Sequence, residues 1–300
     1  MDKDNFMDLY QMTIKMPALA APAVENLLME ADFDGLQWQD DYAMKQVAVT
    51  VYATTKQTLQ TKSTILQPQI DRLLEFGINP HPFKIEIKPV NGKWKTNWEA
   101  SYQAERITRF LTIAPTWSDY EPMPNSDERV IRLDPGMSFG TGTHPTTKLA
   151  LQALETVLRG QETVFDVGCG SGVLSIAARS LGALQIVAGD NDPIAVAATQ
   201  RNFANNPVMK LNHQVKQQSL LTEQDQLADV IVANMLAEVL LLLIPQVNDH
   251  LTATGKFILA GIYVDQLAKV TNALNQQHLK IEQTLTRGKW YALIASKEQR

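Results

Sequence analysis

Apolar and polar residues follow two different patterns along the chain, and the change falls near Arg129. From there onward, short apolar runs alternate with segments in which apolar residues recur every three or four positions. The runs predict strands and the spaced segments predict amphipathic helices. Such runs place strands at residues 163–167, 185–189, 229–233 and 256–260, and a further short strand is expected near 213–217. Helices are expected at residues 145–158, 172–181, 192–205, 236–250 and 264–276.

Regular alternation of strand and helix predicts a doubly wound α/β sheet over residues 129–300. The last two segments break the alternation, because residues 278–286 and 289–296 are both strand-like and meet at Arg287-Gly288. A hairpin there would place one antiparallel strand in an otherwise parallel sheet.

The first ninety residues have a different pattern. Strands are expected at 10–16, 35–38, 46–52 and 83–88, and helices at 18–31 and from Ser63 to Phe76. The order βαββαβ predicts a small ferredoxin-like α+β domain, which we assign to residues 1–92. This segment carries eight basic and twelve acidic residues, a net charge of −4 that would suit a basic partner. We expect it to recognise the substrate; the alternative is an appendage that only stabilises the fold.

Residues 93–128 are expected to form a linker between the two domains. The segment contains Trp94, Trp98 and Trp117 together with several prolines. The aromatic residues predict that the linker is anchored to its surroundings and does not behave as a disordered tether.

Composition narrows the classes of protein to consider. The chain has 300 residues, 45% of them hydrophobic and 20% charged, as in ordinary globular proteins of two domains. Its net charge of −5 argues against direct nucleic-acid binding. A single cysteine fits the reducing cytoplasm, and neither a signal peptide nor a membrane-spanning run is visible. The five histidines lack metal-ligand spacing, so no metal is expected.

The most informative stretch is Val164-Phe-Asp-Val-Gly-Cys-Gly-Ser-Gly172, a strand that runs into a glycine turn and opens a helix. Asp190 ends the next strand, 22 residues after Gly168. In such a βαβ unit the glycines let backbone N–H groups approach a nucleotide, and the acid accepts hydrogen bonds from the ribose. Val173 stands where a dinucleotide site has its third glycine. With Asp166 before the turn, the pattern resembles the first motif of class I S-adenosylmethionine-dependent methyltransferases.

Cys169 lies inside this turn and is the only cysteine of the chain. We interpret it as a small residue that fills space between glycines, because no histidine is near it in sequence to activate a thiol.

Further motifs resemble one family within that class. They are Leu133-Asp-Pro-Gly-Met-Ser-Phe-Gly-Thr-Gly-Thr-His-Pro-Thr-Thr147, Ala233-Asn-Met-Leu236, Trp98-x-x-x-Tyr102, Thr112-Ile-Ala-Pro-Thr-Trp117 and Trp290. Together with the glycine turn they resemble the bacterial methyltransferase of large-subunit ribosomal protein eleven (PrmA family), over nearly the whole chain. The resemblance implies a seven-stranded class I methyltransferase sheet that ends in the antiparallel hairpin.

The resemblance also implies a cofactor, S-adenosyl-L-methionine, bound by Thr147, Gly168, Gly170, Asp190 and Asn234. Thr147 falls in the first turn of a helix, where free N–H groups and the helix dipole favour the methionyl carboxylate. Asn234 ends a strand at the carboxyl edge of the sheet, where open α/β folds bind ligands. Alternatively, Thr147 is only a capping hydroxyl and Asn234 only closes the strand.

The expected activity is transfer of methyl groups to lysine side chains, and to the N-terminal α-amine, of that ribosomal protein. Asn234 would orient the amine, and no residue has to act as a general base. The sequence has Asn-Met-Leu where many amine methyltransferases have Asn-Pro-Pro-aromatic. The alternative function is a class I methyltransferase that acts on another protein, a small-molecule amine or a nucleic acid. A non-catalytic adenosyl-binding protein is a further alternative, and Val173 disfavours a dinucleotide oxidoreductase.

Overall fold

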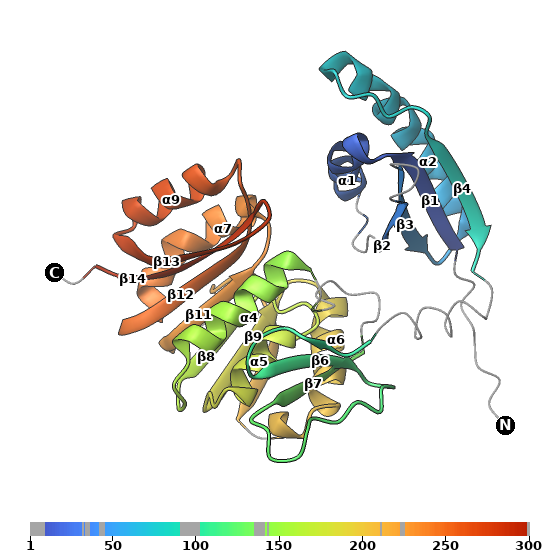
Figure 1. Cartoon of the computed structure of the whole chain (residues 1–300). Coiled ribbons are helices and arrows are strands. Elements are labelled where there is room, and N and C mark those ends of the chain that lie inside the picture. Colours follow the sequence, from blue (N-terminus) through green and yellow to red (C-terminus); the bar gives the residue numbers. More distant parts are fainter. Residues whose placement is uncertain are drawn as a thin grey trace. The chain divides into compact units, whose positions relative to one another are not determined.

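The structure is a computed structural model of the 300-residue chain, shown in Figure 1. It describes residues 10–31, 33, 37–41, 46–90, 103–134, 142, 144–210, 212–222 and 226–298. The chain divides into two compact units, Met1–Ser101 and Tyr102–Arg300. The buried apolar residues of the first unit form one cluster, and those of the second form two.

The first unit has the predicted order βαββαβ and is ferredoxin-like. Its elements are β1 (Tyr10–Pro17), α1 (Ala21–Glu30), β2 (Gln37–Asp41), β3 (Gln46–Ala53), α2 (Lys56–Asp71) and β4 (Lys84–Pro89). All strand pairs are antiparallel, in the order β2-β3-β1-β4. Successive residues of a strand face opposite sides, and accordingly Met12, Ile14 and Met16 are buried while Lys15 is exposed. The alternating pattern seen in the sequence therefore marks the core side of this sheet.

The prediction that Ser63 begins the second helix is wrong. Helix α2 begins at Lys56, and Thr55 is its N-cap, with Oγ1 accepting a hydrogen bond from the Thr58 N–H at 3.1 Å. The first two turns are polar and bury only Leu59, so the apolar period that predicted the helix is weak there. A 3-10 helix, Arg72–Phe76, follows and ends at Gly77, as expected.

The second unit contains a seven-stranded sheet in the order β10-β9-β8-β11-β12-β14-β13. Its strands are β8 (Thr163–Val167), β9 (Gln185–Asp190), β10 (His213–Gln217), β11 (Ala228–Asn234), β12 (Leu251–Tyr263), β13 (Leu279–Arg287) and β14 (Trp290–Lys297). Its helices are α4 (Pro145–Val157), α5 (Val173–Ser180), α6 (Pro193–Ala204), α7 (Ala237–Leu243), α8 (Val247–His250) and α9 (Leu267–Gln276). Only β14 is antiparallel to both its neighbours, which confirms the predicted doubly wound sheet with a C-terminal hairpin.

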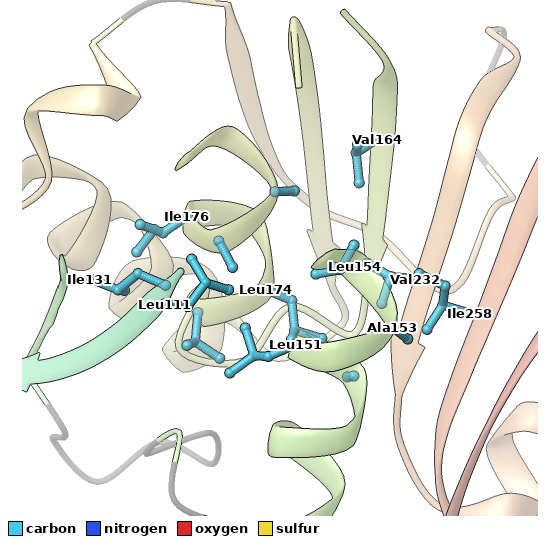
Figure 2. Close-up of a cluster of buried hydrophobic side chains, with 14 of the residues drawn as sticks. Leu111, Ile131, Leu151, Ala153, Leu154, Val164, Leu174, Ile176, Val232 and Ile258 are labelled. Atoms are coloured by element: carbon cyan, nitrogen blue, oxygen red, sulfur yellow. The ribbon is translucent and has the colours of Figure 1, made fainter. Parts of the chain in front are cut away.

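The two faces of this sheet bury separate apolar clusters. Along β11, Val230 and Val232 join the cluster with α4 and α5, whereas Ile231 and Ala233 join the cluster with α7 and α9. Figure 2 shows the first cluster, where Leu154 of α4 lies near side chains from β11 and β12. A strand covered on both faces reads as a continuous apolar run, and this is why these strands were recognisable from sequence.

Part of the predicted linker belongs to the second unit. A small sheet, β5 (Glu105–Arg106), β6 (Leu111–Pro115) and β7 (Arg129–Leu133), begins within residues 93–128. Leu111 and Ile131 are buried against α5 residues Leu174 and Ile176 in the same cluster (Figure 2). Of the predicted aromatic anchors, Trp94 and Trp98 lie outside the described residues, and Trp117 is 37% exposed.

Two boundaries differ from expectation for identifiable reasons. The helix predicted at 236–250 is interrupted by a 3-10 turn, Ile244–Gln246, because Pro245 cannot donate a helical hydrogen bond. Strand β12 is longer than predicted and extends to Tyr263 across a bulge between Ala260 and Ile262. Among the described residues, none of the helices is long and apolar enough to span a membrane.

The bulge in β12 depends on Gly261, a position that none of the sequence motifs marks. Its φ angle is +90°, and a Cβ atom there would overlap the carbonyl oxygen of Met235 and lie 2.9 Å from its carbonyl carbon. Only glycine permits β12 to approach the end of β11 this closely.

Replacing Gly261 by alanine should therefore destabilise the second unit by about 3 kcal/mol or more, because left-handed strain adds to a backbone clash. Gly288→Ala is the matched control, since Gly288 has φ +62° and nothing within 4 Å of the added Cβ. It should cost only ~1–2 kcal/mol. Urea unfolding measures both; equal losses would show that the approach of β12 to Met235 is unimportant.

Candidate cofactor and active site

The turn after β8 is built from three glycines in the left-handed region. The φ angles of Gly168, Gly170 and Gly172 are +73°, +54° and +79°. The N–H groups of Gly168 and Cys169 both donate to the carbonyl oxygen of Gly189, at 2.8 and 3.0 Å. This pair of bonds ties the turn to the end of the neighbouring strand β9. The predicted sequence of strand, glycine turn and helix is therefore present, and it lies at the carboxyl edge of the sheet.

Asp190 lies at the end of β9 and holds the same turn. Its Oδ2 accepts from the Gly170 N–H at 3.0 Å and its Oδ1 accepts from the Asp192 N–H at 3.0 Å. We expected glycine N–H groups to face the ligand, but those of Gly168 and Gly170 are already used within the protein. Because these glycines have no side chain, a ligand can come close to the backbone of the turn. The carboxylate oxygens of Asp190 have further lone pairs that can accept hydrogen bonds from ligand hydroxyls.

Asp166 is fully buried beneath the turn. Its Oδ2 accepts two hydrogen bonds from Ser175 in α5, from the backbone N–H at 3.0 Å and from the hydroxyl at 2.7 Å. Its Oδ1 has no hydrogen-bond partner among the described residues. Burial, and to a lesser degree the nearby charge of Asp190, raise the pKa of this carboxyl to about 6, against the opposing effect of the Ser175 bonds.

Cys169 occupies a buried place beside these acids. Burial raises the pKa of its thiol, and its Sγ lies 3.2 Å from the Thr199 hydroxyl oxygen. A thiol that stays protonated is a poor nucleophile, so this environment supports the interpretation of Cys169 as a small filler.

Two residues predicted from distant motifs meet at this edge of the sheet. Asn234 ends β11, and its Nδ2 donates to Oγ1 of Thr147 at 3.2 Å, across 87 positions of sequence. Thr147 lies in the first turn of α4 and its side chain is fully buried. Among the described residues the Oδ1 of Asn234 makes no hydrogen bond, so it remains as an acceptor.

The residue after Asn234 connects this pair to the glycine turn. A Cβ atom built on Gly168 would lie 2.7 Å from Cε of Met235, so the methionine packs directly over the glycine. Thr147, Asn234 and the turn are consequently parts of one site. The sequence motifs predicted only that they lie at the same edge of the sheet.

Three aromatic rings flank the start of α4. His144, the N-cap of that helix, contacts Trp290 edge to face at a centroid distance of 5.2 Å, and Trp290 contacts Tyr263 at 5.0 Å. Tyr263 and Trp290 are register partners at the ends of β12 and β14. Burial lowers the pKa of His144, which favours the neutral imidazole.

Most of the loop before α4 lies outside the described residues, including positions 135–141 and 143. The five predicted cofactor residues are all described and stand at or beside this edge. Sequence reasoning missed the structural partners of the site: Ser175, Met235 and Tyr263. A serine on the apolar face of the helix after the turn was the available signal for Ser175.

The site fits an adenosyl cofactor on two observations. Gly168 has no side chain and a φ of +73°, and among the described residues only the flexible end of Met235 lies close to the position of an added Cβ, so a ligand can approach the backbone there. The buried Oδ1 of Asp166 is an acceptor that a ligand donor would satisfy. With the sheet order and the acid of β9, these features define a class I S-adenosylmethionine-dependent methyltransferase.

Comparison with known proteins identifies the family within that class. The sequence model described as "Ribosomal protein L11 methyltransferase (PrmA)" matches residues 8–298. The chain therefore belongs to the ribosomal protein L11 methyltransferase (PrmA) family.

Individual relatives support this family assignment. The chain is similar to the ribosomal protein L11 methyltransferase of Pediococcus pentosaceus, with 48% identity over 232 residues that cover 77% of this chain and 73% of that protein. It is 39% identical to that of Enterococcus faecalis, covering 96% and 98% of the two chains. The crystal structure of ribosomal protein L11 methylase from Lactobacillus delbrueckii subsp. bulgaricus matches 66% of this chain and 100% of that chain, with 40% identity and a TM-score of 0.62.

The pKa of Asp166 predicts a pH dependence of stability. Between its ordinary pKa of 3.8 and the folded value of about 6, the folded protein holds a proton that the unfolded chain has lost. The folded state then binds more protons, so the free energy of unfolding falls as pH rises from about 4 to 6, by up to ~3 kcal/mol.

Asp166→Asn removes this titration. The stability of the wild type relative to the variant should therefore fall across that pH range and stay constant above it, as measured by urea unfolding at a series of pH values. Parallel pH curves for the two proteins would contradict the raised pKa.

Proposed function

We propose that this protein transfers methyl groups from S-adenosylmethionine to amines of ribosomal protein L11, namely lysine side chains and the N-terminal α-amine. The observation that carries the proposal is the Thr147–Asn234 hydrogen bond beside the glycine turn, which leaves an amide oxygen at the carboxyl edge of the sheet. The relatives named for this substrate, which align with almost the full chain, support the choice of protein.

The proposed cofactor contacts are Thr147, Gly168, Gly170, Asp190 and Asn234. Asp190 would accept from the ribose hydroxyls, with its carboxylate already oriented by the backbone of Gly170 and Asp192. Thr147 would act through the first turn of α4, where the helix dipole favours a carboxylate. The bound cofactor supplies an electrophilic methyl group on its sulfonium, so the protein needs no covalent intermediate.

The task of the protein is to present an uncharged amine. A lysine with an ordinary pKa of about 10.4 is protonated at neutral pH, and a site sheltered from water favours the free amine. The Oδ1 of Asn234 would accept an amine N–H and direct the nitrogen lone pair, with the amide itself held by Thr147. The proton can pass to water, and without a fixed base the same amine can return for further rounds of methylation.

The proposal is tested by incubating the purified chain with radiolabelled S-adenosylmethionine and ribosomal protein L11. We expect label in this protein, and mass spectrometry should place 14-Da increments on lysine residues or on the α-amine, since each methyl replaces one hydrogen. Label that appears only in another protein or in a small amine from an extract would support the alternative substrate class.

Asp190→Ala should weaken binding of S-adenosylhomocysteine by about tenfold to a hundredfold, because a charge-assisted hydrogen bond contributes ~1.5–3 kcal/mol. Asp192→Ala is the control: Asp192 caps α6 through the Ile194 N–H at 2.8 Å and should affect stability but not affinity. Calorimetry on the two folded variants separates the outcomes, and unchanged affinity in Asp190→Ala would remove Asp190 from the site.

We further propose that the N-terminal domain, residues 1–92, recognises the substrate. All proposed cofactor residues belong to the second unit, which has its own core. A chain that lacks residues 1–92 should bind S-adenosylhomocysteine with nearly unchanged affinity and lose methyl transfer to ribosomal protein L11. Equal transfer rates for the shortened and full chains would assign recognition to the second unit.

A further inference from the structure

Helix α6 carries polar side chains on the face that turns into the protein. Thr199 and Asn202 lie three positions apart, and Asn206 follows just beyond the end of the helix. Their exposed fractions are only 0%, 1% and 3%. Burial of a hydroxyl or amide costs free energy unless its hydrogen bonds are satisfied, so the partners of these side chains indicate what they do.

Two of these side chains donate hydrogen bonds to carbonyl oxygens of the glycine turn. The Thr199 hydroxyl donates to the carbonyl oxygen of Gly170 at 2.9 Å, and the Asn202 Nδ2 donates to the carbonyl oxygen of Ser171 at 2.9 Å. Thr199 also limits the turn sterically, because its Cγ2 would lie 3.0 Å from a Cβ on Gly172. Two consecutive peptide groups of the turn are thus held by one face of α6.

Asn202 links the turn to a second element. Its Oδ1 accepts from the Asp134 N–H at 2.8 Å, directly after β7. The side-chain amide therefore has an acceptor beside its Nδ2 and a donor beside its Oδ1, and this fixes its orientation. In the flipped orientation Oδ1 would face the Ser171 carbonyl oxygen and Nδ2 would face the Asp134 N–H, and neither pair can form a hydrogen bond.

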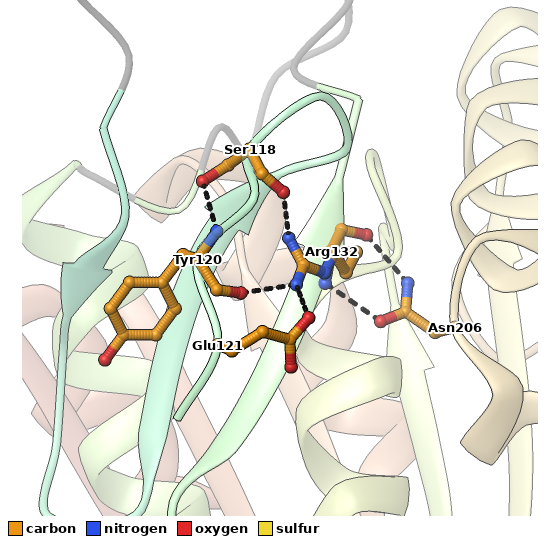
Figure 3. A network of polar contacts seen from close by, with 5 residues as sticks. All are labelled: Ser118, Tyr120, Glu121, Arg132 and Asn206. Carbon is orange, nitrogen blue, oxygen red and sulfur yellow. Dashed lines mark hydrogen bonds and ion pairs between the residues drawn. The ribbon is translucent and has the colours of Figure 1, made fainter. Parts of the chain in front are cut away.

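The side-chain amide of Asn206 also bonds main-chain groups on both sides, but those groups belong to Arg132 in β7. Its Oδ1 accepts from the Arg132 N–H at 2.9 Å and its Nδ2 donates to the Arg132 carbonyl at 2.7 Å, as Figure 3 shows. The Arg132 guanidinium in turn donates to the carbonyls of Ser118 and Tyr120. The Asn206 Nδ2 also donates to the main-chain carbonyl of Asn202 at 2.7 Å, a bond that the Asn202 side chain does not share. Among the described residues this network secures β7 and makes no hydrogen bond to the glycine turn, so Asn206 serves as the control for the side chain of Asn202.

We propose that Thr199 and Asn202 are positioning residues for cofactor binding: through the Gly170 and Ser171 carbonyls they hold the glycine turn in its binding conformation. The inference rests on the proposed cofactor role of the turn. Glycine has the largest conformational freedom of any residue, and a turn with three of them would lose much entropy when a ligand orders it. A turn held beforehand binds more tightly, because only the competent fraction of the population binds.

The test compares four variants of the full chain. Thr199→Val keeps the shape of the side chain and removes its hydroxyl donor, whereas Thr199→Ser keeps the hydroxyl and removes the methyl group. Asn202→Leu and Asn206→Leu are a matched pair of isosteric changes. Calorimetry gives the affinity for S-adenosylhomocysteine, thermal unfolding gives stability, and hydrogen exchange of residues 166–175 without ligand reports on the turn itself.

We expect Thr199→Val and Asn202→Leu to lower affinity at least about tenfold and to speed exchange in the turn. Thr199→Ser should bind within about twofold of the wild type, because the hydroxyl is retained. Asn206→Leu should lower the unfolding temperature and leave affinity and turn exchange nearly unchanged.

The inference is overturned if Thr199→Val binds as the wild type does, or if Asn206→Leu loses as much affinity as Asn202→Leu. If Asn202→Leu does not fold, the Val and Ser variants of Thr199 decide. Failure of the proposed cofactor site is distinguishable, because the wild type itself would then not bind S-adenosylhomocysteine, and the positioning role would fall with it.

Discussion

The site depends on the double hydrogen bond from Gly168 and Cys169 to the carbonyl of Gly189. This bond brings the end of β8 against the end of β9 and so places Asp190 under the turn. The same geometry requires left-handed glycines, which bring Met235 and, with it, Asn234 close to the turn. Backbone contacts between the ends of β8 and β9 therefore position Asp190 and the turn, and side-chain hydrogen bonds with α4 and α6 then hold Asn234 and the turn in place.

Much of the fold could be predicted because its strands are buried on both faces. Continuous apolar runs separated by helical periods identify β8, β9 and β11 almost to the residue, and the hairpin follows from two successive strands with a glycine between them. The start of α2 was missed because its first turns are exposed and polar, and a helix stabilised there by the Thr55 cap has little apolar period. Pro245 breaks a helix whose apolar pattern continues through it, and periodicity alone does not register that break.

The candidate site was predictable to the extent that it lies in local motifs. The sequence itself shows glycines with an acid at a fixed spacing, and an asparagine that ends a strand. The contact between Thr147 and Asn234 spans distant segments, and only the shared carboxyl edge hinted at it. The roles of Thr199 and Asn202 could not be predicted, because a polar residue in a helix usually faces solvent and these two face inward. Ser175 differs, because its place on the apolar face of α5 was a signal that the sequence offered.

The aromatic contacts among His144, Trp290 and Tyr263 have a consequence for how the enzyme is made. They join the N-cap of the first helix before the glycine turn to the last strand of the sheet. Strand β14 is inserted between β12 and β13, so the sheet is incomplete until the chain has been synthesised beyond Trp290. A nascent chain can form the cofactor turn well before then, because β8, β9 and α6 precede this strand. Assembly of the site on the ribosome is thus expected to be ordered in time, with the cofactor half first and the aromatic side last.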